Sequence, residues 1–206
     1  MAQAYDAPRR RAQAQATRDR VLASAHHLFT VHGYATTSVA SVAAHAEVSD
    51  RFLYSVFGSK RGLLLALLEH FAPTPCAAFE TEIAAAQDAA AQLALAVDFV
   101  TGYYATASDL LAITLPAAAS DADLRAFVEQ GEMFRRLAQR PLIDQWAASG
   151  ALRLELTTSE AADVLWAMTS PEVYLKLGAA GWASERIRVW LTQILTEALL
   201  PDDGGG

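Results

Sequence analysis

The chain has 206 residues, of which 53% are hydrophobic and 19% charged, and its formal net charge is −7. This composition excludes a disordered chain and favours a globular, alanine-rich and largely helical protein of one well-buried domain or two small ones. The longest apolar stretches, such as LLLALL at 63–68, are too short to cross a bilayer, and the N-terminus lacks the apolar segment of a secretion signal. With Cys76 as its only cysteine, the chain forms no internal disulfide, and we expect a cytoplasmic protein without membrane attachment.

Positive charge is concentrated near the N-terminus. Residues 1–62 hold eight Lys or Arg against four acidic residues, a balance of +4, and the remainder carries −11. Because phosphate binding depends on local charge, this asymmetry keeps a nucleic-acid partner open despite the acidic total. We expect residues 1–16, with Arg9, Arg10 and Arg11, to form a basic flexible arm.

The first predicted helix begins at Thr17, a candidate N-cap, and ends at Gly33, which can adopt the left-handed conformation that follows many helices. Its apolar face consists of Val21, Leu22, Ala25, Leu28 and Phe29.

Three shorter helices are predicted to follow. Thr37 or Ser38 caps the second, Ser49 the third and Ser59 the fourth, which is rich in leucine and ends before Pro73 and Pro75. Helices this short are marginal alone, so they must pack on one another.

The third predicted helix of the chain, residues 50–58, has two different sides when it is placed on a helical wheel. One side is expected in the core and holds Phe52, Leu53, Val56 and Phe57. The other holds Arg51, Tyr54, Ser55 and Gly58. Arginine can pair bidentately with guanine, and tyrosine and serine can donate to phosphate oxygens. Two short helices joined by a tight turn, the second with such a face, indicate a helix-turn-helix.

In their order, these residues resemble the TetR (tetracycline repressor) family of transcriptional regulators. The resemblance covers residues 17–64 and rests on Leu28-Phe29 with Gly33-Tyr34, TSVxxVA at 37–43, VS at 48–49, LYxxF at 53–57 and SKxxLL at 59–64. It implies that the third helix enters the major groove, that Thr37 or Ser38, Tyr54 and Lys60 contact phosphates, and that Asp50, Arg51 and Ser55 lie where family members read bases. The predicted DNA-facing set is Thr37, Ser38, Ser49, Asp50, Arg51, Tyr54, Ser55 and Lys60.

The turn departs from the family pattern, because Glu47 stands where glycine is common. A non-glycine residue held at positive φ costs on the order of 1 kcal/mol, and its carboxylate repels nearby DNA. Phe52 and Val56 also differ from the small and the aromatic or histidine residues common there. The histidines have no ligand partners at suitable spacing, so we expect neither a metal site nor a cofactor.

Residues 65–200 are alanine-rich and helix-periodic, with breaks expected near Pro116 to Ser120, Ser149-Gly150, Ser170-Pro171 and Gly178 to Trp182, and helix starts at Ser120 and at TTSE, 157–160. Their dispersed aromatic residues serve either as plain core or as the lining of an apolar small-molecule site. The candidates for the site are Phe99, Tyr103, Phe127, Phe134, Trp166 and Met168.

The last segment, 181–200, has a broad apolar face made of Trp182, Ile187, Trp190, Leu191, Ile194, Leu195 and Ala198. This face is either buried within one subunit or, as the resemblance implies, part of a four-helix dimer interface. A helix-turn-helix protein normally needs two-fold symmetry to span two half-sites.

We therefore expect an all-α protein with a helix-turn-helix domain at 17–64, a ligand-binding and dimerisation domain at 65–200, and a disordered tail at 201–206. The expected function is that of a homodimeric repressor, released from a palindromic operator in double-stranded DNA by a small, mainly apolar effector. The alternative is a helical small-molecule or partner-binding protein with weakened or lost DNA binding. An enzyme is not expected, because the sequence has no HExxH, GxSxG or glycine-rich phosphate loop.

Overall fold

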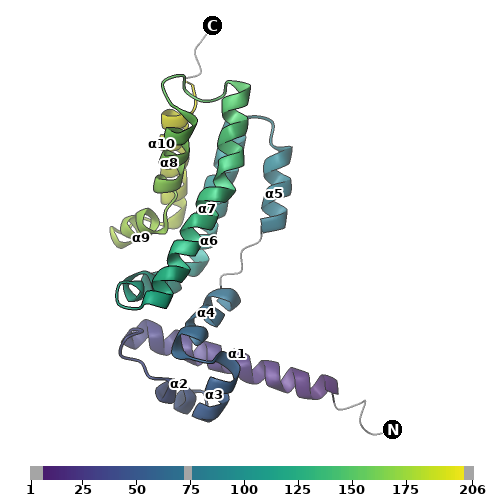
Figure 1. The fold of residues 1–206 in the computed structure, drawn as a ribbon, viewed down its shortest axis with the longest axis vertical. Coiled ribbons are helices and arrows are strands. Elements are labelled where there is room, and N and C mark those ends of the chain that lie inside the picture. The colour runs from purple at the N-terminus through teal and green to yellow at the C-terminus, as the bar shows by residue number, and fades with distance from the viewer. Residues whose placement is uncertain (1–6, 72–75, 202–206) are drawn as a thin grey trace. The chain divides into compact units, whose positions relative to one another are not determined.

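The computed structural model describes residues 7–71 and 76–201, and within those ranges every regular element is an α-helix (Figure 1). The expected all-α class is thus confirmed. The helices are α1 (Ala7–His32), α2 (Val39–His45), α3 (Asp50–Phe57), α4 (Lys60–Phe71), α5 (Cys76–Ala85), α6 (Ala89–Ala118), α7 (Ala122–Ser149), α8 (Thr158–Met168), α9 (Pro171–Ala179) and α10 (Ser184–Leu199). In these ranges the chain forms two compact units: 7–71 with Ala112–Leu124, and 76–111 with 125–201. The expected boundary at residue 64 falls inside α4.

Helix α1 starts earlier than the sequence indicated. It begins at Ala7, and Thr17 lies within it, where its hydroxyl donates to the Gln13 carbonyl at 2.9 Å instead of capping the helix. The stretch is rich in alanine, arginine and glutamine, which favour helix, and a proline at position 8 is tolerated in a first turn. The expected flexible arm is therefore wrong for residues 7–16, which are helical, while residues 1–6 lie outside the described part.

The predicted inner face of α1 is confirmed, since Val21, Leu22, Ala25, Leu28 and Phe29 are all buried or nearly so. Helix α1 packs against α2 and α4, and α3 packs against the same two helices (Figure 1). The four helices of the N-terminal part thus share one core, as such short helices require.

Local capping signals place the short helices as predicted. Gly33 follows α1 with φ 84°. Ser38 caps α2 in a reciprocal pair with Ser41, and the Ser49 hydroxyl accepts from the Phe52 amide at the start of α3. Ser59 accepts from the Gly62 amide at 3.0 Å and so caps α4. Helix α4 ends at Phe71, and the two prolines expected to stop it, Pro73 and Pro75, lie outside the described residues.

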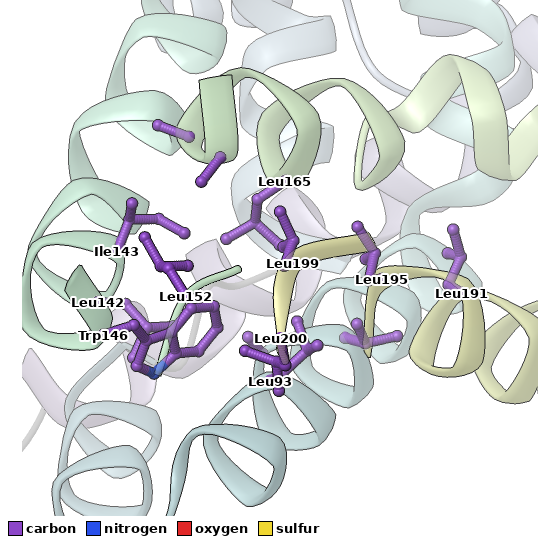
Figure 2. Packing of buried hydrophobic residues seen from close by; sticks show 14 of the residues in the cluster. Leu93, Leu142, Ile143, Trp146, Leu152, Leu165, Leu191, Leu195, Leu199 and Leu200 are labelled. Atoms are coloured by element: carbon purple, nitrogen blue, oxygen red, sulfur yellow. The ribbon is translucent and has the colours of Figure 1, made fainter. Parts of the chain in front are cut away.

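The second unit has its own apolar core, which includes Leu165 of α8 and Leu191, Leu195 and Leu199 of α10 (Figure 2). Trp146 of α7 is buried in the same core, and its indole N–H donates to the Gln92 side-chain oxygen at 2.6 Å.

The helix boundaries of this unit were mostly predicted. The capping box of Thr157 and Glu160 starts α8, and Ser170 caps α9. The predicted break between Pro116 and Ser120 is confirmed, since α6 ends at Ala118, although Pro116 itself lies in the last turn of α6. One expectation was wrong: the carboxylate of Asp121, not Ser120, accepts from the first amides of α7. The end of a long helix tolerates proline when the packing around it favours helix, because few backbone bonds are lost there.

No helix in the described ranges is both long and apolar enough to span a membrane.

Candidate nucleic-acid interface

Helix α3 divides into the two sides that the wheel predicted, with one exception. Leu53 is 2% exposed and anchors the helix, while Phe52 and Phe57 are half-buried. Tyr54 is 54% exposed. Arg51 and Ser55 are exposed beside it. The exception is Val56, which was expected in the core and is 43% exposed.

The turn before α3 contains the strained residue that the sequence indicated. Glu47 has φ 53°, the only positive φ of a non-glycine residue in the described chain. Two contacts hold this turn in place: the Arg20 guanidinium donates to the Ala46 carbonyl at 2.9 Å, and the Val48 amide donates to the Ala43 carbonyl at 3.0 Å. Such surroundings allow a left-handed residue to persist at a cost of about 1 kcal/mol.

The serine hydroxyls of the candidate interface already have local roles. Ser38 and Ser49 are exposed, and each accepts a bond from a helix amide. Since a capping hydroxyl uses its oxygen lone pair, its proton can still be donated to a phosphate. Ser55 donates to the Phe52 carbonyl at 2.8 Å, so its oxygen can accept a bond from a base.

Thr37 was predicted to contact DNA, and the structure contradicts this. It is 5% exposed, and its hydroxyl faces the carbonyl oxygens of Gly33 at 2.9 Å and Leu28 at 3.2 Å. The residue ties the end of α1 to the start of α2, and of the pair Thr37 and Ser38 only the serine can reach a phosphate.

Lys60 is held on its own unit in this structure. Its ammonium donates to the Ala35 carbonyl at 3.2 Å and lies 4.4 Å from the centre of the Tyr34 ring. Burial lowers the pKa of Lys60, and burial, followed by the charge of Asp121, raises the pKa of Tyr34. The bond to Ala35 uses one of the three N–H donors of Lys60, so the ammonium keeps donors for a phosphate.

Two further cations flank this region. Arg61 forms an ion pair with Asp123, and Arg18 lies 5.5 Å from the centre of the Phe57 ring. The run Arg9-Arg10-Arg11 is exposed on the first turns of α1, so these charges are carried by a helix and not by a loose segment.

The predicted ligand residues do not form one lining. Phe127 and Phe134 are exposed, the latter by 62%, so neither lines a buried site. Phe99 stacks on Phe79 with ring centres 4.2 Å apart, and Tyr103 meets Tyr104 edge to face. Trp166 and Met168 are half-buried on α8.

The predicted dimer face is also divided. Ile187, Leu191 and Leu195 lie in the core of their own subunit, which removes them from any interface between copies (Figure 2). Trp182, Trp190 and Ile194 are half-buried, and Ala198 is exposed. A shallow surface groove runs along this outer side of α10, lined by Trp182, Ala183, Glu185, Arg186, Val189, Trp190 and Gln193.

Sequence reasoning missed the residues that act through long-range contacts. The Arg20 contact to the turn joins residues 26 apart, and a polar cluster around Arg135 and Thr169 joins residues 34 apart. Neither has a short motif. The described residues contain no group of three or more side chains suited to hold a metal ion.

The fold and this surface define a class: an all-helical protein whose N-terminal unit carries a helix-turn-helix. Residues 21–67 match the model of the family described as bacterial regulatory proteins, tetR family. The N-terminal unit is thus similar to the TetR family over these residues, and solved TetR-family regulators share the fold of most of the chain.

Individual proteins show the same similarity. The HTH-type transcriptional repressor NicS of Pseudomonas putida is 36% identical over 58 residues, which are 28% of this chain and 27% of that protein. The fatty acid degradation regulator FadR of Bacillus halodurans has the same fold, with a TM-score of 0.71 at 18% identity, covering 87% of this chain and 94% of that one. A putative transcriptional regulator of Saccharomonospora viridis in complex with choline also gives 0.71, at 17% identity, over 91% and 100% of the two chains.

Proposed function

We propose that the protein is a homodimeric repressor that binds a palindromic operator through α3 and releases it when a small effector binds the second unit. The main support is the exposed side of α3, which holds Arg51 and Tyr54, while the buried Leu53 packs the other side of the helix into the core. Arginine, a phenol and a hydroxyl on one exposed side match the donors needed in a major groove. The match of 58 residues to a named repressor supports repression.

The test is operator binding. Sequences selected from random DNA provide the operator, and gel shifts then compare the wild type with Arg51→Ala and Arg51→Ala/Tyr54→Ala. Loss of one bidentate base contact costs about 1–3 kcal/mol, so the single variant is expected to bind roughly 5- to 150-fold more weakly and the double variant not detectably.

The matched control is Arg140→Ala, which removes the same charge from an exposed arginine paired with Asp144 on α7. Its affinity should equal that of the wild type. If the double variant binds the selected DNA as tightly as the wild type does, α3 is not the reading helix.

The dimer is proposed on the outer side of α10. Trp182 and Trp190 lie edge to face there, with ring centres 5.6 Å apart, and Arg186 lies 3.9 Å from the centre of the Trp182 ring. Large aromatic residues beside arginine are typical of the centres of protein interfaces. Trp190→Asp should give a monomer in analytical ultracentrifugation, and a dimer that persists would place the interface elsewhere.

The effector is proposed to bind the second unit, which shares its fold with a regulator solved in complex with choline. Its binding would shift the equilibrium between two arrangements of the dimer, of which only one binds DNA.

A further inference from the structure

A cluster of polar side chains lies inside the second unit, among helices α6, α7 and α8. Arg135 and Gln139 are four residues apart on α7, and Trp166 and Thr169 lie at the C-terminal end of α8. The hydroxyl of Tyr104, on α6, donates to the Thr169 carbonyl at 3.0 Å. Buried polar groups are costly unless they are paired, so the bonds within this cluster are worth following atom by atom.

Thr169 fixes the orientation of Gln139. The threonine hydroxyl donates its single proton to the Leu165 carbonyl at 2.6 Å, so other groups that face its oxygen must be donors. These donors are Gln139 Nε2 at 2.9 Å and Arg135 Nη1 at 3.1 Å. The amide oxygen of Gln139 therefore points away from Thr169 and needs a donor of its own.

Three buried atoms of this cluster have no hydrogen-bond partner among the described residues: Arg135 Nε, Gln139 Oε1 and Trp166 Nε1. Each such atom costs about 1–3 kcal/mol when it is left unpaired, and native proteins contain few of them. Two of the three atoms are N–H donors, so a ligand that binds this cluster must supply hydrogen-bond acceptors such as oxygen atoms.

The guanidinium of Arg135 indicates which acceptor fits. Its Nε and Nη2 lie on one edge, and a carboxylate can bind such an edge through two parallel hydrogen bonds. Nη2 is bonded to Glu132 and Nη1 to the Trp166 carbonyl, so Nε is the unpaired half of that edge. The side chain of Arg135 is 13% exposed and that of Glu132 is 26% exposed, so the carboxylate now on the edge is the more accessible partner and the easier one to displace.

Trp166 adds an apolar wall to this edge. Its ring centre lies 5.5 Å from the Arg135 guanidinium carbon and 5.2 Å from that of Arg136, and cations near an indole are attracted to it. The indole thus offers a flat apolar surface together with one N–H donor. A ligand that uses both must combine an apolar body with an oxygen anion.

We propose that this cluster binds the carboxylate of a small organic acid with an apolar body. The carboxylate takes the Nε–Nη2 edge of Arg135 in place of Glu132 and accepts a further bond from Trp166 Nε1. The inference rests on the proposed function, because it makes such an acid the effector of the regulator.

The test uses the full chain, with octanoate and phenylacetate as probes and octanamide and phenylacetamide as uncharged counterparts of the same shape. Calorimetry and thermal shift should show that at least one acid binds and raises the Tm, whereas its amide does not. Binding of an amide as tight as that of its acid, or no binding by either acid, overturns the proposal.

Three variants test the residues. Arg135→Gln should weaken acid binding at least about tenfold, because the two-bonded edge is lost. Glu132→Gln should strengthen it several-fold, because the competing carboxylate is gone, and a purely structural role for this pair predicts no gain. Arg140→Gln, with the same charge change on the same helix, should bind as the wild type does. If Arg135→Gln does not fold, Arg135→Lys keeps the charge without the fork and should also weaken binding.

Gel shifts with the selected operator separate the two proposals. Acid binding that leaves the DNA complex intact keeps this site but removes the acid as effector. A protein that binds the acids but no DNA overturns the proposed function and leaves the site standing.

Discussion

The two units dispose their polar side chains in opposite ways. On α3 of the first unit, Arg51, Tyr54 and Ser55 are exposed and Leu53 is buried. In the second unit, Arg135 and Gln139 turn their polar atoms inward, and some of those atoms have no partner in the described chain. A DNA duplex is contacted by side chains that are exposed on the protein surface. A small ligand is instead enclosed by the protein and loses its hydration shell. This difference fits the DNA partner proposed for the first unit and the small-molecule partner proposed for the second.

The largest expected effect comes from the buried side of α3. Leu53→Ala removes a fully packed side chain and should cost about 2–5 kcal/mol of stability, as seen for large-to-small core changes. Thermal and denaturant unfolding measure the loss. Its neighbour provides the control: Tyr54→Ala should change stability by less than about 0.5 kcal/mol, as exposed positions do, while it weakens operator binding. Equal destabilisation by the two variants would contradict the division of α3 into two sides.

A smaller loss is expected from the buried pair in the second unit. Trp146→Phe removes the N–H that Gln92 accepts and leaves a buried amide oxygen unpaired, at a cost of about 1–3 kcal/mol measured by denaturant unfolding. Replacing both partners, Trp146→Phe with Gln92→Met, should recover part of that loss. If the double variant is less stable than Trp146→Phe alone, the loss of stability comes from packing and not from the hydrogen bond.

A substitution in the turn of the helix-turn-helix should raise stability, in contrast to the two losses above. Glu47→Gly relieves a residue held at φ 53° and should raise stability by up to about 1 kcal/mol. It also removes an exposed carboxylate close to α3, so operator affinity should rise, and the gain should shrink at high salt. Glu69→Gly is not a suitable control, because it would break a helix. Glu47→Gln removes the charge alone, so it separates the effect of the charge from the effect of the backbone strain.

What could be predicted from the sequence is what its local signals specify. Ser38, Ser49 and Thr157 cap their helices through bonds to amides three residues away, and a reader of the sequence can find such pairs. The burial of Thr37 depends on the carbonyl of Leu28, nine residues away across a turn. No short pattern records that contact.

The second unit was harder to predict because an apolar face does not reveal what covers it. The face of α10 was correctly read as apolar, but Ile187, Leu191 and Leu195 are covered by their own subunit. The polar cluster was missed for the same reason. Two adjacent arginines, Arg135 and Arg136, suggest a solvent-exposed pair in the sequence. Only the packing of α7 on α8 shows that Arg135 is largely buried and Arg136 exposed.

The smallest expected effect concerns the start of α8, and it depends on pH. Bonds from the Thr157 hydroxyl and amide lower the pKa of Glu160, so its charged form is favoured in the folded state. A carboxyl group with a lowered folded pKa contributes stability above its unfolded pKa, and this contribution disappears as the pH falls through the folded value. Glu160→Gln should therefore lower the Tm slightly at neutral pH and have no effect well below pH 4.5, the ordinary pKa of the group. Glu155→Gln, at a nearby carboxyl group outside the capping box, is the comparison, and an equal Tm change for the two variants would remove the specific role of the Thr157 cap.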